Sequence, residues 1–267
     1  MKRFTQAMKR NFGVEIEISG GNFSQMRAEI TQFNRTQGVD QSWEFKHEHC
    51  GKEIVSPILS GKKGFKALET VLGILNRNGA TVDRRCGLHV HLDIRAWNRL
   101  RSDVLIENAR RFQKFYVKYE QYIDSLMPRS RKEDNNGFTQ GWRHIGNIEN
   151  CFERIDECRS IHGLQYEFQG GRYRKVNWHA FDRHGSVEVR HHSATTDYTK
   201  ISNWVFFLLG LIDQSEKQST RIAPHNRGTR NMNNEQRLSH MHERMMKLVK
   251  ADDEMKSYFS VRSQAMR

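Results

Sequence analysis

The clearest alternation of apolar and polar positions runs through residues 86–97, which read CGLHVHLDIRAW. In an extended strand, the apolar side chains from Leu88 to Ile94 fall on one face, and His89, His91 and Asp93 fall on the other. Two histidines at this spacing can both reach one metal ion or one phosphate cluster. For this motif alone, a strand with a solvated polar face is an equally good interpretation.

Three further segments, 11–19, 52–58 and 186–192, show the same two-faced design. Their polar faces carry Glu15, Glu17, Glu53, Glu188, Arg190 and His192. Carboxylates are depleted in strands, and like charges side by side on one face repel, so the first pair of glutamates is costly unless a cation lies between them. The four segments predict a divalent-metal site on an antiparallel sheet. Oxygen ligands with a minority of imidazoles favour Mg²⁺ or Mn²⁺ over structural zinc.

Other segments predict a mixed α+β fold. Apolar residues at helical spacing predict helices over 23–35, 62–78, 102–126, 145–161, 197–213 and 236–259. Two more strands are expected over 42–48 and 172–179, the second forming a hairpin with 186–192. The polar, Gly/Asn-rich residues 128–143 predict a loop that crosses the mouth of a site.

The composition changes after residue 213, where a stretch rich in Asn, Arg, Ser and Gln begins. The chain is therefore expected to divide into a core over 1–213 and a basic linker with a C-terminal amphipathic helix over 214–267. That helix is expected to dock on the core, on a second subunit or on nucleic acid. A homo-oligomer is thus left open.

Charge and composition indicate which classes of partner are expected. The 267 residues carry a net charge of +13, which fits nucleic acid, nucleotides or other anionic substrates. No apolar run is long enough for a membrane helix, and the basic N-terminus lacks the apolar region of a signal peptide, so no membrane partner is expected. The four cysteines form no CxxC pair and are interpreted as reduced thiols of a cytoplasmic protein.

Several segments together resemble the amidoligase family over roughly residues 11–212. They are FGVEIE, EIVSPILSG, CGLHVHLD, VNW and VEVRHHSATTDYTKISNW, in this order and spacing. The resemblance implies the catalytic fold of glutamine synthetase and glutamate–cysteine ligase, with a curved antiparallel sheet, helices on its outer face and an ATP site on its concave side. It also implies ATP-dependent formation of an amide or peptide bond between a carboxylate and an amine, for which we expect an acyl-phosphate intermediate.

The resemblance also implies roles for individual residues. The positions that match metal ligands are Glu15, Glu17, Glu53, His89 and Glu188. His91 is expected near the nucleotide phosphates, and Arg172 and Asn177 fall in the family's RYxxxN segment, which we assign to nucleotide binding. Arg190 matches the arginine that steadies the transferred phosphate, and Arg131 matches a loop arginine that meets substrate or phosphate. With Glu188, these two arginines make up the expected catalytic set.

Two other functions fit parts of the sequence. The net charge and the basic residues 214–267 would suit a protein that binds or modifies nucleic acid, with salt-dependent and sequence-independent affinity. A zinc hydrolase using His89 and His91 ranks last, because the carboxylates outnumber the imidazoles.

Overall fold

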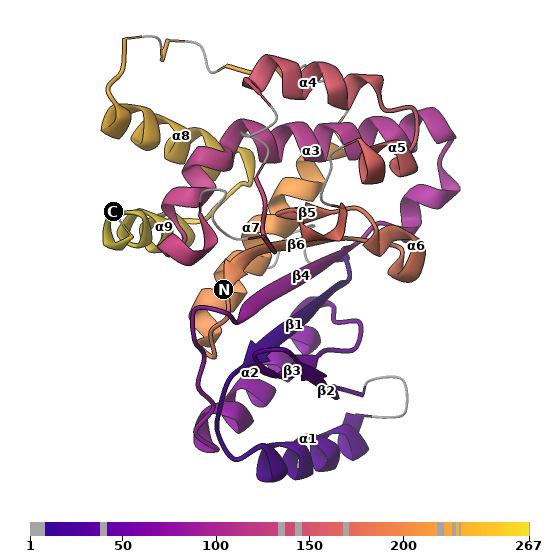
Figure 1. The fold of residues 1–267 in the computed structure, drawn as a ribbon, viewed down its shortest axis with the longest axis vertical. Coiled ribbons are helices and arrows are strands. Elements are labelled where there is room, and N and C mark those ends of the chain that lie inside the picture. The colour runs from indigo at the N-terminus through magenta and orange to yellow at the C-terminus, as the bar shows by residue number, and fades with distance from the viewer. Residues whose placement is uncertain are drawn as a thin grey trace.

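The fold is taken from a computed structural model that describes residues 9–37, 42–132, 137–141, 146–167, 171–217, 222–225, 228–229 and 231–266. Within these ranges, six strands form one antiparallel sheet in the order β2-β3-β1-β4-β6-β5 (Figure 1). The strands are β1 Phe12–Ile18, β2 Glu44–Glu48, β3 Gly51–Val55, β4 Gly87–Asp93, β5 Val176–Asn177 and β6 Ser186–Ser193. A fold that combines helices with one antiparallel sheet is compatible with the expected α+β class.

The apolar face of the sheet is covered by two helices, α2 (Gly61–Arg77) and α7 (Tyr198–Ser215). The side chains beneath them are fully buried at Val14, Ile16, Leu88 and Val90 on the two central strands. Phe65 of α2 packs between Phe12 of β1, at 4.9 Å between ring centroids, and Phe206 of α7, at 4.3 Å. Burying this face leaves the opposite face, with its charged residues, for the site.

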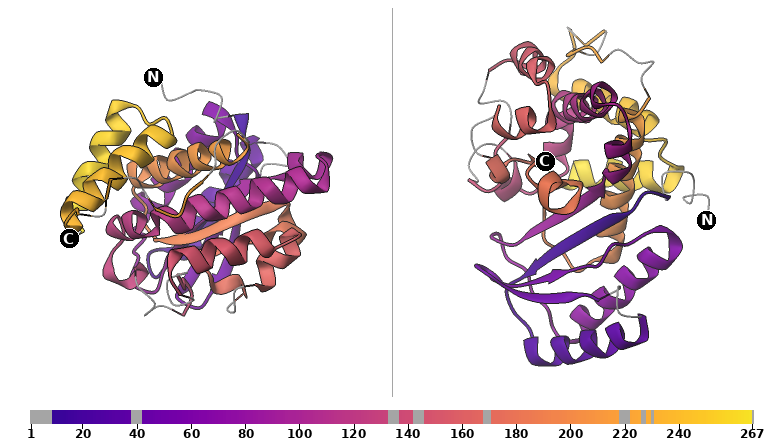
Figure 2. Two further views of the ribbon diagram at one scale, coloured as in Figure 1. Left: turned by 90° about the horizontal axis from the view of Figure 1, so that it is seen from above. Right: turned by 90° about the vertical axis from the view of Figure 1, so that its right-hand side faces the viewer.

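The other helices lie at the two ends of the sheet. Helix α1 (Phe23–Gln37) packs beside α2 near the β2 edge, whereas α3 (Ser102–Ser125) lies beyond β6 and β5 with α4 (Ile148–Glu157) and α5 (Ile161–Tyr166) (Figure 2). Helix α3 also contacts α7 and α8. Within the described ranges, none of the helices combines the length and apolar character that crossing a bilayer requires.

The C-terminal region forms two helices rather than the single helix expected over 236–259. They are α8 (Asn234–Leu248) and α9 (Asp253–Ala265). The break has a local cause, because Lys250 has a left-handed φ of 54° and the Asp252 side chain caps the new helix at the Met255 N–H. Both helices pack on the main core, with Phe259 at 5.5 Å from Phe207 of α7.

Two further expectations are confirmed only in part, for similar reasons. The strand expected over 172–179 is reduced to β5, which is preceded by a 3₁₀ turn (Gly171–Tyr173) and followed by the short helix α6 (Ala180–His184). The side chain of Asn177 accepts a hydrogen bond from the His179 N–H at 3.0 Å and turns the chain. The helix expected over 145–161 is divided into α4 and α5, because Ser160 caps a second helix through the Gly163 N–H; residue 145 lies outside the described residues.

The loop expected over 128–143 is described only at residues 128–132 and 137–141. Its first part holds a 3₁₀ turn, Arg129–Arg131. Its second part pairs through Gln140 with Arg174, beside β5. The expected helices over 23–35, 62–78, 102–126 and 197–213 are confirmed with small shifts at their ends.

Strand β6 contains an irregularity that the simple alternation does not predict. Its register with β4 pairs Val189 with Val90 but His192 with Leu88, so Arg190 and His191 both lie opposite His89. This is a β-bulge, and it moves the following side chains to the other face. His192 was expected on the polar face with Glu188; instead it is buried on the apolar side, 5.5 Å from the Trp204 ring of α7.

Candidate active site

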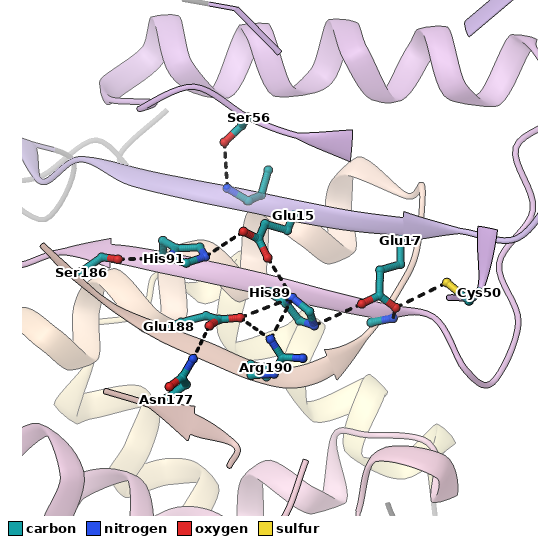
Figure 3. A network of polar contacts seen from close by, with 12 residues as sticks. Glu15, Glu17, Cys50, Ser56, His89, His91, Asn177, Ser186, Glu188 and Arg190 are labelled. Carbon is teal, nitrogen blue, oxygen red and sulfur yellow. Dashed lines mark hydrogen bonds and ion pairs between the residues drawn. The ribbon is translucent and has the colours of Figure 1, made fainter. Parts of the chain in front are cut away.

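The polar face of the sheet gathers acidic and imidazole side chains from four neighbouring strands, β3, β1, β4 and β6. Figure 3 shows those of β1, β4 and β6. The registers place Glu15 opposite His89, Glu17 opposite Glu53, and His91 opposite Glu188. Residues far apart in the sequence therefore meet because an antiparallel sheet brings alternate side chains of adjacent strands within contact distance. The expected metal-binding residues Glu15, Glu17, Glu53, His89 and Glu188 lie together in one cluster.

Glu15 is at the centre of this cluster. Its Oε2 lies 3.0 Å from His89 Nδ1, and its Oε1 lies 3.2 Å from His91 Nε2. Burial on its own would raise the pKa of Glu15, but the hydrogen bonds and positive charges of the two histidines outweigh it and hold the pKa well below its usual range. Glu15 is therefore a carboxylate at neutral pH.

Glu188 lies on the other side of the histidines and is 6% exposed. Its Oε1 is 3.4 Å from His89 Nδ1 and accepts a hydrogen bond from Arg190 Nη1 at 2.7 Å. Burial opposes ionisation, yet the charges of His89, Arg190 and His91 lower the pKa of Glu188. The pKa of His91 is raised, because its hydrogen bond to Glu15 and the nearby carboxylates outweigh burial.

Glu53 has the opposite behaviour. Burial, followed by the negative charges of Glu15, Glu17 and Glu48, raises the pKa of Glu53 to about 8. Burial is the larger cause, and the contribution of three neighbouring carboxylates indicates an excess of negative charge around one point. A bound cation would relieve that repulsion and allow Glu53 to ionise.

The ligand atoms form two sets of three in which all atoms lie within 4.8 Å of one another. One set is Glu15, His91 and Glu188, and the other is Glu15, Glu53 and His89. Because Glu15 belongs to both sets, it could contribute a ligand to either of two neighbouring cation positions. Carboxylate oxygens with one imidazole each suit Mg²⁺ or Mn²⁺, so the residues present fit the expected metal. His91, expected near phosphate, also lies among the candidate ligands.

Two arginines border the cluster. Arg190 Nη1 lies 3.5 Å from His89 Nδ1, and the Arg190 side chain is 16% exposed. Arg131 is 3% exposed, and its Nη2 donates to the Arg85 carbonyl at 2.9 Å. A Cβ on Gly87 would lie 2.9 Å from His89 Nε2 and 3.3 Å from the Arg131 guanidinium. A glycine at this position therefore lets Arg131 approach the histidine.

Asn177 and Arg172 occupy different environments. Asn177 Nδ2 donates to Glu188 Oε2 at 2.6 Å, so this side chain orients a candidate metal ligand. The exposed Arg172 guanidinium lies 5.0 Å from the Tyr173 ring centroid, and its hydrogen bond to Tyr173, followed by the charges of Glu188 and Glu48, raises the pKa of Arg172. Arg172 is thus at the rim of the cluster, outside the two ligand sets.

The sequence reasoning missed three residues that hold these side chains in place. Glu17 Oε2 accepts hydrogen bonds from the Gly87 N–H at 2.7 Å and from the Cys50 thiol at 3.5 Å. His91 Nδ1 lies 3.0 Å from Ser186 Oγ. Ser186 could have been found, since it lies two residues before Glu188 on the same strand face. Cys50 lies in the turn between β2 and β3, and Gly87 contributes only its backbone N–H, so the side-chain pattern reveals neither.

A small cavity adjoins Glu15 at the N-terminal end of β1. Its volume is about 170 Å³, and its lining combines Gly13, His91 and Ser186 with the apolar Pro57 and Ile58. The cavity opens beside one of the two ligand sets, so a small organic group could lie next to a bound cation.

A family model described as "Putative amidoligase enzyme" matches residues 34–212 of the chain. This range includes β2, β3, β4, β5 and β6, with Glu53, both histidines and Glu188, and it begins after β1. No curated protein matches the chain.

Proposed function

Because the chain belongs to the amidoligase family, we propose that it is an ATP- and divalent-metal-dependent ligase that joins a carboxylate to an amine. The observation that carries the proposal is the pair of ligand sets that share Glu15 on the polar sheet face. Such a site suits a metal–nucleotide complex, since two adjacent cations can neutralise phosphate oxygens. We also propose that the sheet is the glutamine synthetase-like one and that the enzyme acts in the cytoplasm.

The proposed reaction has two steps. A carboxylate resists attack by an amine because an oxide is a poor leaving group. A substrate carboxylate oxygen therefore attacks the γ-phosphorus of ATP, ADP leaves, and an acyl phosphate forms. The amine nitrogen then attacks the acyl carbon, inorganic phosphate departs, and the nitrogen loses a proton.

The protein's part is positioning and charge neutralisation. Glu15, Glu53, His89, His91 and Glu188 would hold Mg²⁺ or Mn²⁺, which when bound offsets the charge of the ATP phosphates. Arg190 and Arg131 border the same cluster and would stabilise negative charge on the transferred phosphoryl group. Asn177 orients Glu188 through its amide.

The test is phosphate release from ATP with Mg²⁺ or Mn²⁺ and pools of amino acids, polyamines, peptides and other amines and carboxylates. We expect release that requires one particular pair of substrates. Glu15→Gln and Glu188→Gln should lower it by about 100-fold or more, because each removes a ligand from the shared cluster. Glu69→Gln on the exposed face of α2 is the matched control and should have no effect.

A second readout covers the case in which the pools lack the true substrate. Binding of Mn²⁺–ATP to the folded chain should then raise its melting temperature, and Glu15→Gln should abolish that rise. The proposed function would be contradicted if the wild-type chain released no phosphate and Mn²⁺–ATP did not raise its melting temperature.

A further inference from the structure

The rim of the cluster carries an exposed aromatic surface that the proposed chemistry does not use. Phe138 is 59% exposed, and its ring meets the Tyr173 ring edge-to-face at 5.4 Å between centroids. The Arg172 guanidinium lies 5.0 Å from the Tyr173 centroid and donates to the Tyr173 hydroxyl at 3.0 Å. We call Phe138, Arg172 and Tyr173 the aromatic rim.

Backbone hydrogen bonds attach the aromatic rim to the strand that carries the site. The Gln140 N–H donates to the Tyr173 carbonyl at 2.9 Å, and the Lys175 N–H donates to the Gln140 carbonyl at 3.1 Å. Lys175 in turn accepts from the Arg190 N–H at 2.9 Å. Two residues span at most about 7 Å, so the backbone of Tyr173 lies close to that of Arg190.

The electrostatic environment of Arg172 also indicates that the aromatic rim lies near the cluster. After its hydrogen bond to Tyr173, the negative charges of Glu188 of β6 and of Glu48 at the end of β2 also raise the pKa of Arg172. Together with the backbone hydrogen bonds that join the rim to Arg190, this indicates that the aromatic rim borders the candidate metal site.

We propose that the aromatic rim binds the adenine ring of the ATP whose phosphates lie at the Glu15 cluster, an inference that rests on the proposed function. An adenine is a flat, weakly polar ring, and exposed aromatic and guanidinium groups bind such rings by stacking and cation–π contacts. The rim offers both kinds of group beside the arginine expected to steady the phosphate. Phe138 and Tyr173 are thus specificity residues for a nucleotide over a bare polyphosphate.

The experiment compares two ligands that share a chain of three phosphates, of which only ATP carries the nucleoside with its adenine ring. Affinities of the Mn²⁺ complexes of ATP and of inorganic tripolyphosphate are measured by calorimetry on the full chain. We expect Phe138→Ala to weaken ATP at least about fivefold and to leave tripolyphosphate within about twofold. Tyr173→Ala should act in the same way, whereas Phe138→Trp should retain ATP affinity.

The matched control is Tyr166→Ala, an aromatic that is 73% exposed and packs on the His179 ring. It should change neither affinity. Unchanged tripolyphosphate binding shows that a variant is folded with its metal site intact. If the wild-type chain binds ATP and both alanine variants of the rim bind it equally well, the inference is wrong and the proposed function stands. A wild-type chain that binds neither ligand overturns both.

Discussion

Glu17 illustrates how single donors control the site. Its Oε2 is occupied by the Gly87 N–H and the Cys50 thiol, which leaves Oε1 facing His89 Nε2 at 3.5 Å. Burial first, and then the contact with Cys86 and the charge of Glu17, raise the pKa of Cys50 well above its usual range. The thiol therefore stays protonated and can act as a donor.

Removing the Cys50 thiol should make the position of the Glu17 carboxylate less fixed, because Oε2 loses one of its two donors. We expect Cys50→Ala to weaken Mn²⁺ binding a few-fold, because a hydrogen bond of this kind contributes about 1 kcal/mol. Cys50→Ser keeps a donor and should restore most of the affinity. The measurement is a Mn²⁺ titration followed by electron paramagnetic resonance, with Cys151→Ala, a buried thiol of α4, as control. Equal affinities for the Ala and Ser variants would argue against a role for the thiol hydrogen.

His192 should contribute to acid sensitivity. Burial, and then the Arg262 charge, lower the pKa of His192 to about 3, and its Nδ1 donates to the Ser193 carbonyl at 2.6 Å. Between pH 6.5 and 3 the unfolded chain gains a proton that the folded chain cannot, so stability falls as pH falls, by at most about 1.4 kcal/mol per pH unit.

The pH dependence can be measured as urea midpoints from pH 7 to 4. His192→Gln should flatten the slope relative to the wild-type chain. His162→Gln, on an exposed side chain, should leave the slope as it is. If stability falls with pH as steeply in the His192→Gln variant as in the wild-type chain, other groups dominate the pH dependence of stability.

The sequence predicted positions best for residues in strands, where side chains alternate between the two faces of the sheet. Glu15, Glu17, Glu53, His89 and Glu188 share one face because alternate residues of paired strands must do so. Arg131 and Cys50 are different, since loops place them and no period predicts a loop. The amide of Asn177 was assigned to nucleotide binding, and only the geometry places it on Glu188.

At the scale of elements, the bulge in β6 separates two functions. Arg190 stays beside the cluster, whereas the neighbouring His191 turns toward α3, where its Nδ1 lies 2.7 Å from the Tyr116 hydroxyl and its Nε2 2.7 Å from Asp124 Oδ1. One strand thus supplies a site arginine and a contact to a helix at adjacent positions.

Lys175 also connects β6 to α3, since its carbonyl accepts a hydrogen bond from the Arg190 N–H of β6 and its side chain reaches α3. It is 1% exposed, and its ammonium contacts Glu120 Oε1 at 2.8 Å and Asp124 Oδ1 at 2.6 Å on α3. We expect Lys175→Met to lower the free energy of unfolding by about 3–5 kcal/mol, because it removes the Lys175 cation from the buried Glu120 carboxylate and from Asp124.

Urea unfolding at neutral pH measures this loss. Lys66→Met, which removes an exposed lysine paired with Glu69 on α2, should change stability by no more than about 0.5 kcal/mol. Similar effects of the two substitutions would mean that the Lys175 contacts add little to the fold.

Elements with a long, regular apolar stripe were predictable, and those divided by caps were not. The helices over 62–78, 102–126 and 197–213 are close to α2, α3 and α7, because each buries one continuous face. The side chain of Asn177 bonds to nearby backbone and turns the chain after β5, and those of Ser160 and Asp252 cap the start of new helices, which hydrophobic spacing does not reveal.

At the scale of the whole molecule, α8 and α9 share the core of the sheet and α7. Met245 and Phe259 are buried in that core. We expect Phe259→Ala to destabilise the entire chain by about 3–5 kcal/mol and to leave one cooperative unfolding transition.

Thermal unfolding followed by circular dichroism and by tryptophan fluorescence tests this expectation. Val261→Ala, two residues away and 63% exposed, should have a small effect. A separate early transition in the Phe259→Ala chain would show instead that the C-terminal helices unfold on their own.

The order of strands in the sheet has a consequence for biosynthesis. A ribosome releases Glu15, Glu53 and both histidines early, but Glu188 emerges only after α3, α4 and α5 have been made. The set of Glu15, His91 and Glu188 therefore exists only once β6 has paired with β4, and α9, which is made after β6, adds to the packing around α7. A nascent chain halted before β6 would carry every candidate ligand except Glu188 and an uncovered β4 edge, exposed to chaperones and to other chains.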